Sequence, residues 1–129
     1  MFKHIVVALA VSGFAISASA ELAPAPCQVM LHAYRACDVS ATAAIATQDP
    51  VVQMATAGHF DYGSFLAAQK QAYRAQGAAA YTAAHCTNPD AQAGDIAYLQ
   101  KVANIIGSMG GDPTGCADAI ANLQDAAQQ

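Results

Sequence analysis

Four cysteines have the most reactive side chains in this 129-residue sequence: Cys27, Cys37, Cys86 and Cys116. An even number of cysteines in a short chain with an export signal favours disulfide bonds over a metal site. If residues 27–37 form one continuous helix, the first two cysteines lie about 15 Å apart along its axis. A disulfide requires Cα atoms within about 7 Å, so these two cannot pair with each other. Each must therefore pair with Cys86 or Cys116.

The pairing itself depends on the directions of the helices that carry the cysteines. Helices joined by a short turn run antiparallel, and antiparallel helices give nested contacts. We therefore prefer the nested pairing, Cys37–Cys86 inside Cys27–Cys116, and keep the crossed pairing as the alternative. Either pair of bridges closes long loops, and each bridge should stabilise the fold by about 4 kcal/mol.

Three histidines outside the export signal could serve as metal ligands or general bases: His32, His59 and His85. Helical metal sites use ligands paired on one face, such as two histidines four residues apart, and these three histidines are scattered. The Cys-x-x-Cys-His motif of c-type haem proteins is also absent from the sequence. We therefore expect neither a metal nor another cofactor.

Catalytic nucleophiles and paired carboxylates have no better support in the sequence. The segment around Ser64 lacks the second glycine and the preceding strand of a nucleophile elbow. Paired carboxylates would have to come from aspartates, and most of these lie beside expected helix starts or breaks, where they would cap backbone N–H groups. The aspartates in question are Asp38, Asp49, Asp61, Asp90 and Asp112. The sequence therefore predicts no enzymatic activity.

Charged and aromatic residues on two of the expected helices could form a surface for a ligand or partner. Arg35, Lys70 and Arg74 could make a small anion pocket where these helices meet, with Tyr73 and Tyr81 nearby. Without residues 1–20, the chain keeps four basic and nine acidic side chains, because Lys3 is the only charged residue removed. Nucleic-acid binding needs clustered Lys and Arg, so this composition argues against it.

Residues 1–20 have the pattern of a cleaved secretory signal peptide. Lys3 precedes an apolar stretch, Ile5–Ala18, and small residues follow at Ala18-Ser19-Ala20. A helix of this stretch spans about 21 Å, which is shorter than the roughly 30 Å hydrocarbon core of a membrane. We therefore expect an exported protein, periplasmic or secreted, with no membrane anchor after cleavage.

Proline and glycine divide the rest of the chain, Glu21–Gln129, into helical segments, and no stretch has the period-two alternation of a strand. Residues 21–26 are expected to be an extended Pro/Ala leader. We expect helices at 27–47, 50–57, from 61 or 64 to 84, at 89–109 and from 113 onward, with Gly77 tolerated inside the third. Alanine is the commonest residue in these helices, so the core is thin and the disulfides are needed to supplement it.

The predicted fold is all-α, a small bundle of four to five helices held by two disulfides in one domain, residues 27–127. The predicted function is that of a non-enzymatic interaction, inhibitor or accessory protein of the cell envelope or secretome, with a protein or envelope partner. The alternative is a carrier of a small apolar ligand. Its pocket would lie between the first, third and fourth expected helices, lined by Phe65, Tyr73, Leu99 and Ile106.

Overall fold

The computed structural model describes residues 22–56 and 61–129, and within these ranges it contains helices and no strand. The α-helices are α2 (Ala25–Ala46), α3 (Pro50–Thr56), α4 (Tyr62–Gln76), α5 (Ala78–Tyr81), α6 (Pro89–Ser108) and α7 (Thr114–Ala127), with a π-helical turn, η1 (Thr82–Cys86), before α6. The all-α prediction is confirmed. The expected signal peptide, residues 1–20, lies outside the described residues.

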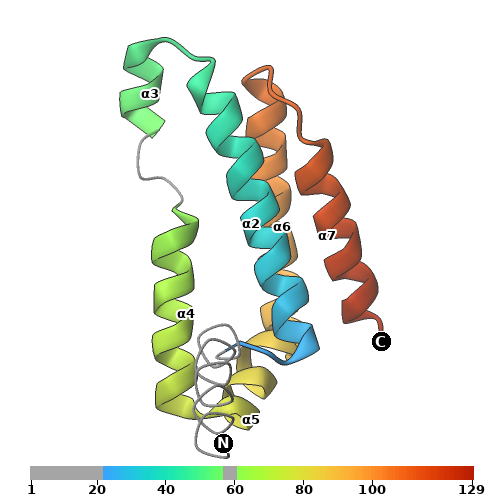
Figure 1. Cartoon of the computed structure of the whole chain (residues 1–129). Helices are drawn as coiled ribbons and strands as arrows, with labels where there is room; N and C mark the ends of the chain where they lie inside the picture. Colours follow the sequence, from blue (N-terminus) through green and yellow to red (C-terminus); the bar gives the residue numbers. More distant parts are fainter. Residues whose placement is uncertain (1–21, 57–60) are drawn as a thin grey trace, which may run out of the picture.

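Three long helices form the centre of the molecule, with α6 parallel to α2 and α7 antiparallel to both (Figure 1). The starts of α2 and α6 are joined by the Cys27–Cys86 disulfide. At their other ends, the Gln48 side-chain amide donates a hydrogen bond to the Met109 carbonyl at 2.9 Å. We call α2, α6 and α7 the frame, and α3 with α4 the arm. The arm lies to one side of the frame in Figure 1.

The disulfides are Cys27–Cys86 and Cys37–Cys116, with Cα atoms 4.9 and 4.3 Å apart. All four cysteines form two disulfides, as expected, but the pairing is the crossed alternative, and the preferred nested pairing is wrong. The arm explains the difference, because it returns the chain to the end of the molecule where α2 begins. Cys86 therefore meets Cys27 before α6 starts, and α7 then descends from the opposite end with Cys116 beside Cys37.

Most helix starts follow local capping rules. The Asp49 and Asp61 side chains accept hydrogen bonds from the N–H groups of Val52 and Gly63, each at 3.0 Å. Helix α2 begins at Ala25, ahead of the expected start at Cys27, because Pro26 has a backbone angle suited to a first helical turn. The extended leader is thus shorter than residues 21–26.

The expected third helix is interrupted at Gly77. This residue has φ +87° and ψ 157°, a conformation that costs glycine little and other residues much more. It ends α4 and starts α5, so the prediction of one helix through residue 84 is wrong. By contrast, the glycine pair after α6 ends that helix as predicted: Gly110 has φ +78°, and the Gly111 N–H bonds to the Ile106 carbonyl at 2.9 Å.

The hydrophobic core lies where the three frame helices meet. Leu99, Ile106 and the cysteines of both bridges have 2% or less of their surface exposed. Tyr81 of α5 is also fully buried, beneath the frame. In contrast, no residue of α3 or α4 is buried, although Phe65, Leu66 and Tyr73 pack partly against the core. The frame therefore carries most of the packing.

Among the described residues, no helix combines the length and apolar character needed to cross a membrane. The two disulfides are consistent with an oxidising compartment outside the cytoplasm.

Candidate functional site

An open groove of about 310 Å³ runs between the upper halves of the parallel helices α2 and α6. Its lining residues are Asp38, Ala41, Thr42 and Ile45 of α2, Thr56 of α3, and Tyr98, Lys101, Val102, Ile105, Ile106 and Met109 of α6. Ile106 is completely buried, so it forms the floor, whereas Ile105 is 54% exposed. We call this feature the α2–α6 groove. Its lining is mostly apolar and open to solvent.

The groove arises from the spacing of residues on its two helices. On α6, Tyr98, Val102, Ile105 and Met109 recur at intervals of four, three and four residues, which places them on one face. This face is separate from the one that buries Leu99 in the core. Helix α6 is therefore apolar on two sides, and within the part of the chain that the structure describes the second side is only partly covered.

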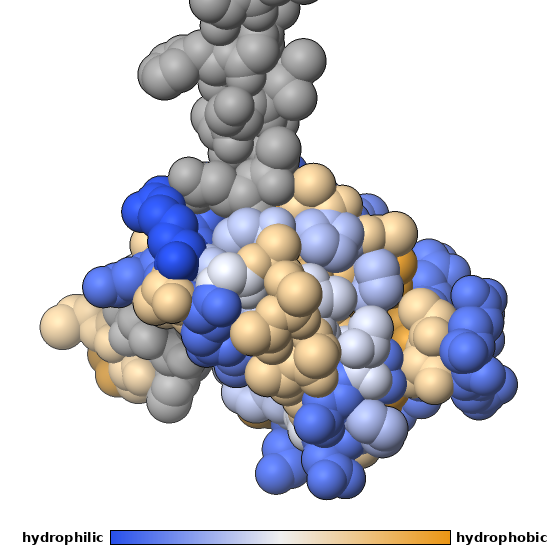
Figure 2. All heavy atoms as spheres, turned by 90° about the horizontal axis from the view of Figure 1, so that it is seen from below, coloured by the Kyte–Doolittle hydropathy of each residue, from blue (hydrophilic) through white to orange (hydrophobic). Residues whose placement is uncertain are grey.

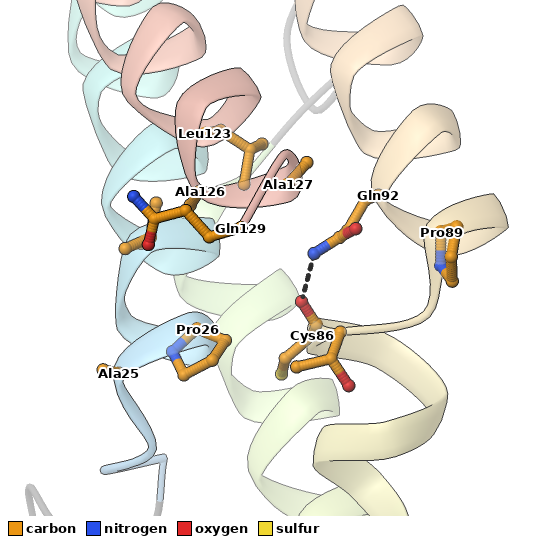
Figure 3. Close-up of a pocket in the computed structure, with 11 residues that line it drawn as sticks. Ala25, Pro26, Cys86, Pro89, Gln92, Leu123, Ala126, Ala127 and Gln129 are labelled. Carbon is orange, nitrogen blue, oxygen red and sulfur yellow. Dashed lines mark hydrogen bonds between the residues drawn. The ribbon is translucent and has the colours of Figure 1, made fainter.

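A second hollow, of about 500 Å³, lies at the opposite end of the molecule (Figure 3). It is bounded by the start of α2, the Cys86–Pro89 turn and the end of α7. There the Gln92 amide donates a hydrogen bond to the Cys86 carbonyl at 2.9 Å. Figure 2 views this end of the bundle and shows hydrophobic residues interrupted by hydrophilic ones. Thr87, Gln92 and Gln129 are among its lining residues, so this hollow is more polar than the mostly apolar groove.

A buried polar pair lies next to the groove, where α4 packs on the frame. The Tyr34 hydroxyl of α2 donates to Asp95 Oδ1 of α6 at 2.6 Å. Burial, followed by this bond and the negative charge of Asp95, raises the pKa of Tyr34. Burial also raises the pKa of Asp95, although the Tyr34 hydrogen bond and the nearby His85 act to lower it. The pair fixes the relative position of the two groove helices.

Tyrosine rings extend this polar pair toward the arm. The Phe65 ring of α4 stacks on Tyr34 with centroids 4.1 Å apart, and Tyr98 lies 6.1 Å from Tyr34 on the groove side. Tyr81 donates a hydrogen bond to Gln69 Oε1 of α4 at 2.5 Å. Burial and the charge of Asp95 raise the pKa of Tyr81 to about 12. Tyr34 and Tyr81 therefore stay protonated at neutral pH. Tyr34 attaches the arm to α2 of the frame, and Tyr81 attaches it to α5.

The predicted histidines form no metal site within the described residues. His32 is exposed on α2, and His85 is half-buried with its ring 4.6 Å from that of Tyr81. His59 lies outside the described residues. Within the described ranges, no group of three His, Cys, Asp or Glu side chains could hold a metal ion.

The aspartates fall into two groups. Asp49, Asp61 and Asp112 accept capping hydrogen bonds as predicted, the last from the Thr114 N–H at 3.0 Å. Asp90 lies in the first turn of α6, where Asn88 is the cap. Asp38 is in the middle of α2 and lines the groove, so it does not cap its own helix. Its carboxylate instead accepts a hydrogen bond from the Tyr62 N–H at the start of α4.

The predicted cationic surface is not formed as one site. Arg35 lies close to Tyr62 at the start of α4. Burial raises the pKa of Tyr62, and the positive charge of Arg35 acts to lower it. Lys70 and Arg74 follow Tyr62 by about 12 and 18 Å along the helix axis. Three cations spread over this length do not surround one small anion.

The aromatic part of that predicted surface also needs correction. Tyr81 is fully buried and cannot contact a partner. Tyr73 is half-buried, with its ring 5.3 Å from that of Tyr81 in an edge-on arrangement. The two rings thus pack against each other where α4 meets α5.

The four residues expected to line a carrier pocket are not gathered around the groove. Phe65 is occupied by its stack on Tyr34, Tyr73 packs on Tyr81, and Leu99 is inside the core. Only Ile106 of the four predicted residues lines the groove. Asp95 and the outer face of α6 were not among the predicted site residues. The helical spacing from Tyr98 to Met109 is a signal that could have revealed this face.

No protein-family model matches this sequence, and neither the curated proteins nor the solved structures that were compared with it gave a match.

Proposed function

We propose that this chain is a small exported protein without catalytic activity, that it binds a partner protein, and that the α2–α6 groove is its binding surface. The observation that supports this function is an open apolar groove built on a frame that two disulfides hold together. Exposed apolar side chains that gather around a concave surface are typical of interaction sites.

The shape of the groove favours a helix as the bound segment. Two parallel helices present apolar residues at helical spacing along their length, and an amphipathic helix lays residues i, i+3, i+4 and i+7 into such a groove. The molecule contains an internal example next to the groove. Helix α4 places Phe65 on Tyr34, one turn from Asp38, on the same side of α2.

A small apolar ligand is the second candidate, and the apolar lining of the groove is what favours it. A volume of about 310 Å³ is at the lower limit for drug-sized ligands, which are usually enclosed over most of their surface. The groove is open, so it would leave much of such a ligand in water. The geometry therefore favours a partner that brings its own covering surface.

The proposal can be tested with a photo-crosslinking amino acid at Ile105, with Ala121 on the exposed face of α7 as the control position. The protein expressed in its own host should crosslink to a defined partner from Ile105 and not from Ala121. With the purified partner, Ile105→Asp should weaken binding at least about tenfold, since a charge in an interface centre costs more than about 1.4 kcal/mol.

The matched variant Ala121→Asp should bind like the wild type. Equal losses in both variants, or no crosslink from Ile105, would contradict the proposed site. Native mass spectrometry of the same preparation should show the protein without a bound small molecule. A stoichiometric apolar ligand would support the carrier function instead.

A further inference from the structure

The charges around the α2–α6 groove are unevenly distributed. Asp38 lines the groove. Burial and then the charge of the neighbouring Asp61 raise the pKa of Asp38, and a hydrogen bond from the Tyr62 N–H acts to lower it. Asp61 is itself exposed, and hydrogen bonds from Ser64 and Gly63 hold its pKa below the usual value. One side of the groove therefore carries two neighbouring carboxylates.

The upper end of the groove is also negative. The Gln48–Met109 hydrogen bond marks the point where α2 and α6 end together, and Asp49 and Asp112 follow these two residues closely. Both helices end with their carbonyl groups at this point, and neither has a basic residue in its last turn. The C-terminal ends of two parallel helices add partial negative charge there.

Two cations lie near these carboxylates without balancing them. Lys101 lines the groove on α6, and Arg35 is about one helical turn from Asp38 on α2. Against them stand four aspartates and two helix C-termini, whereas the starts of α3, α4 and α7, which Asp49, Asp61 and Asp112 cap, add partial positive charge. Four full negative charges against two cations still leave the described surroundings of the groove with an excess of negative charge. An acidic rim around an apolar floor favours a ligand with apolar and basic faces.

From this charge pattern we infer that the groove takes a basic amphipathic helix, with apolar residues on the groove floor and Lys or Arg residues beside Asp38, Asp61, Asp49 and Asp112. This inference rests on the proposed function, because it specifies the partner for the same groove. An acidic helix would place like charges against the rim. An anionic membrane surface is disfavoured for the same reason.

The test uses two synthetic amphipathic peptides with the same leucine positions, one with lysine and one with glutamate on the flanks. Fluorescence anisotropy with the full-length mature protein should show at least about tenfold tighter binding of the lysine peptide at low salt. High salt should reduce this preference, because exposed charges are screened.

Two double variants with the same change in net charge locate the effect. Asp38→Asn with Asp61→Asn should weaken binding of the lysine peptide about threefold or more, and Asn remains an adequate helix cap at position 61. Asp118→Asn with Asp125→Asn, on α7, is the matched control and should change binding much less. Ile105→Asp should weaken the binding of either peptide.

The outcomes separate this inference from the proposed function. If the glutamate peptide binds as tightly as the lysine peptide, and Ile105→Asp weakens both, the basic partner is wrong and the groove remains a binding site. If the lysine peptide binds equally well to Ile105→Asp, it binds elsewhere on the acidic surface, and the inference is overturned. If neither peptide binds, both the inference and the helix-binding function are contradicted.

Discussion

The frame and the arm are held by different kinds of interaction. Both disulfides include a cysteine of α2, and one of them joins two frame helices directly. The arm contains no cysteine, and none of its residues is buried. In sequence, the arm lies between the two cysteines of each disulfide, so its ends are held close to the frame. Its helices depend on weaker contacts. The comparison shows that one small domain can have two levels of local stability.

The contacts of the arm are few and identifiable. Phe65 stacks on Tyr34, and Gln69 accepts a hydrogen bond from Tyr81. An aromatic pair contributes about 0.5–1.5 kcal/mol beyond its buried area, and one hydrogen bond contributes a similar amount. The arm is therefore expected to open without unfolding of the frame.

Removal of the bridge between α2 and α7 should have the largest effect on the frame. The double substitution Cys37→Ala with Cys116→Ala removes a disulfide between residues 79 positions apart in the sequence. The loss should be about 4 kcal/mol, because the unfolded chain regains the corresponding freedom. Urea unfolding followed by circular dichroism measures this loss. A loss below about 1 kcal/mol would show that packing alone holds the frame.

Truncation of one leucine in each region should separate the two regions clearly. Leu99 is fully buried in the frame, so Leu99→Ala should cost about 3 kcal/mol. Leu66 of α4 is only partly buried, and Leu66→Ala should cost about 1 kcal/mol. Equal losses in urea unfolding would contradict the distinction between frame and arm.

A methyl group added at the upper end of the frame should be poorly tolerated. A Cβ atom at Gly111 would lie 2.6 Å from the Ala44 Cβ atom and 3.1 Å from the Ile106 carbonyl oxygen. Gly111→Ala should therefore cost about 2 kcal/mol. Gly107 has open space around it within α6, so Gly107→Ala should stabilise the protein by up to about 1 kcal/mol. Thermal unfolding of both variants measures this contrast.

The hydrogen bond between Tyr34 and Asp95 should contribute less to stability than the packing of Leu99 in the frame. Tyr34→Phe keeps the ring for the Phe65 stack and removes the hydroxyl donor, which leaves a partly buried carboxylate without this bond. The expected cost is about 1–2 kcal/mol. The same substitution in an Asp95→Asn background should cost less, and an unchanged cost would show that the two groups are not coupled.

The smallest of the predicted effects is the pH dependence of stability that comes from Asp95 of the Tyr34–Asp95 pair. Burial raises the pKa of Asp95 in the folded protein above its value of about 3.9 in the unfolded chain. The stability that protonated Asp95 contributes is fully present below that value and is lost as the pH rises through the folded pKa. The wild type should therefore lose stability relative to Asp95→Asn over this range. Parallel curves for the two proteins in urea unfolding would contradict this assignment.

Local signals in the sequence were sufficient for the helices and most of their ends. Asp49-Pro50 starts a helix and Gly110-Gly111 ends one, and both effects come from the conformational preferences of these residues and their immediate neighbours. They could therefore be recognised without tertiary structure. The positive φ of Gly77 could not be predicted, because a glycine among alanines is compatible both with a continuous helix and with a break between two helices. The choice depends on the packing of Tyr73 against Tyr81.

The disulfide pairing and the groove depend on the directions of whole helices. The nested pairing assumed that the first and later helices are direct antiparallel neighbours, whereas the arm makes α2 and α6 parallel. The groove exists because α6 has a second apolar face whose upper half is left partly open by the described residues, with Thr56 of α3 at its edge. Its residues could be seen in the sequence, but their exposure could not.

Native-state hydrogen exchange tests the distinction between the frame and the arm most directly. Amides of α4 should exchange by local opening, with protection several kcal/mol below that of amides around Leu99 and Ile106 in α6. Exchange of α4 at the same free energy as the centre of α6 would show that the arm and frame unfold as one unit, and would contradict a frame that is more stable than its arm.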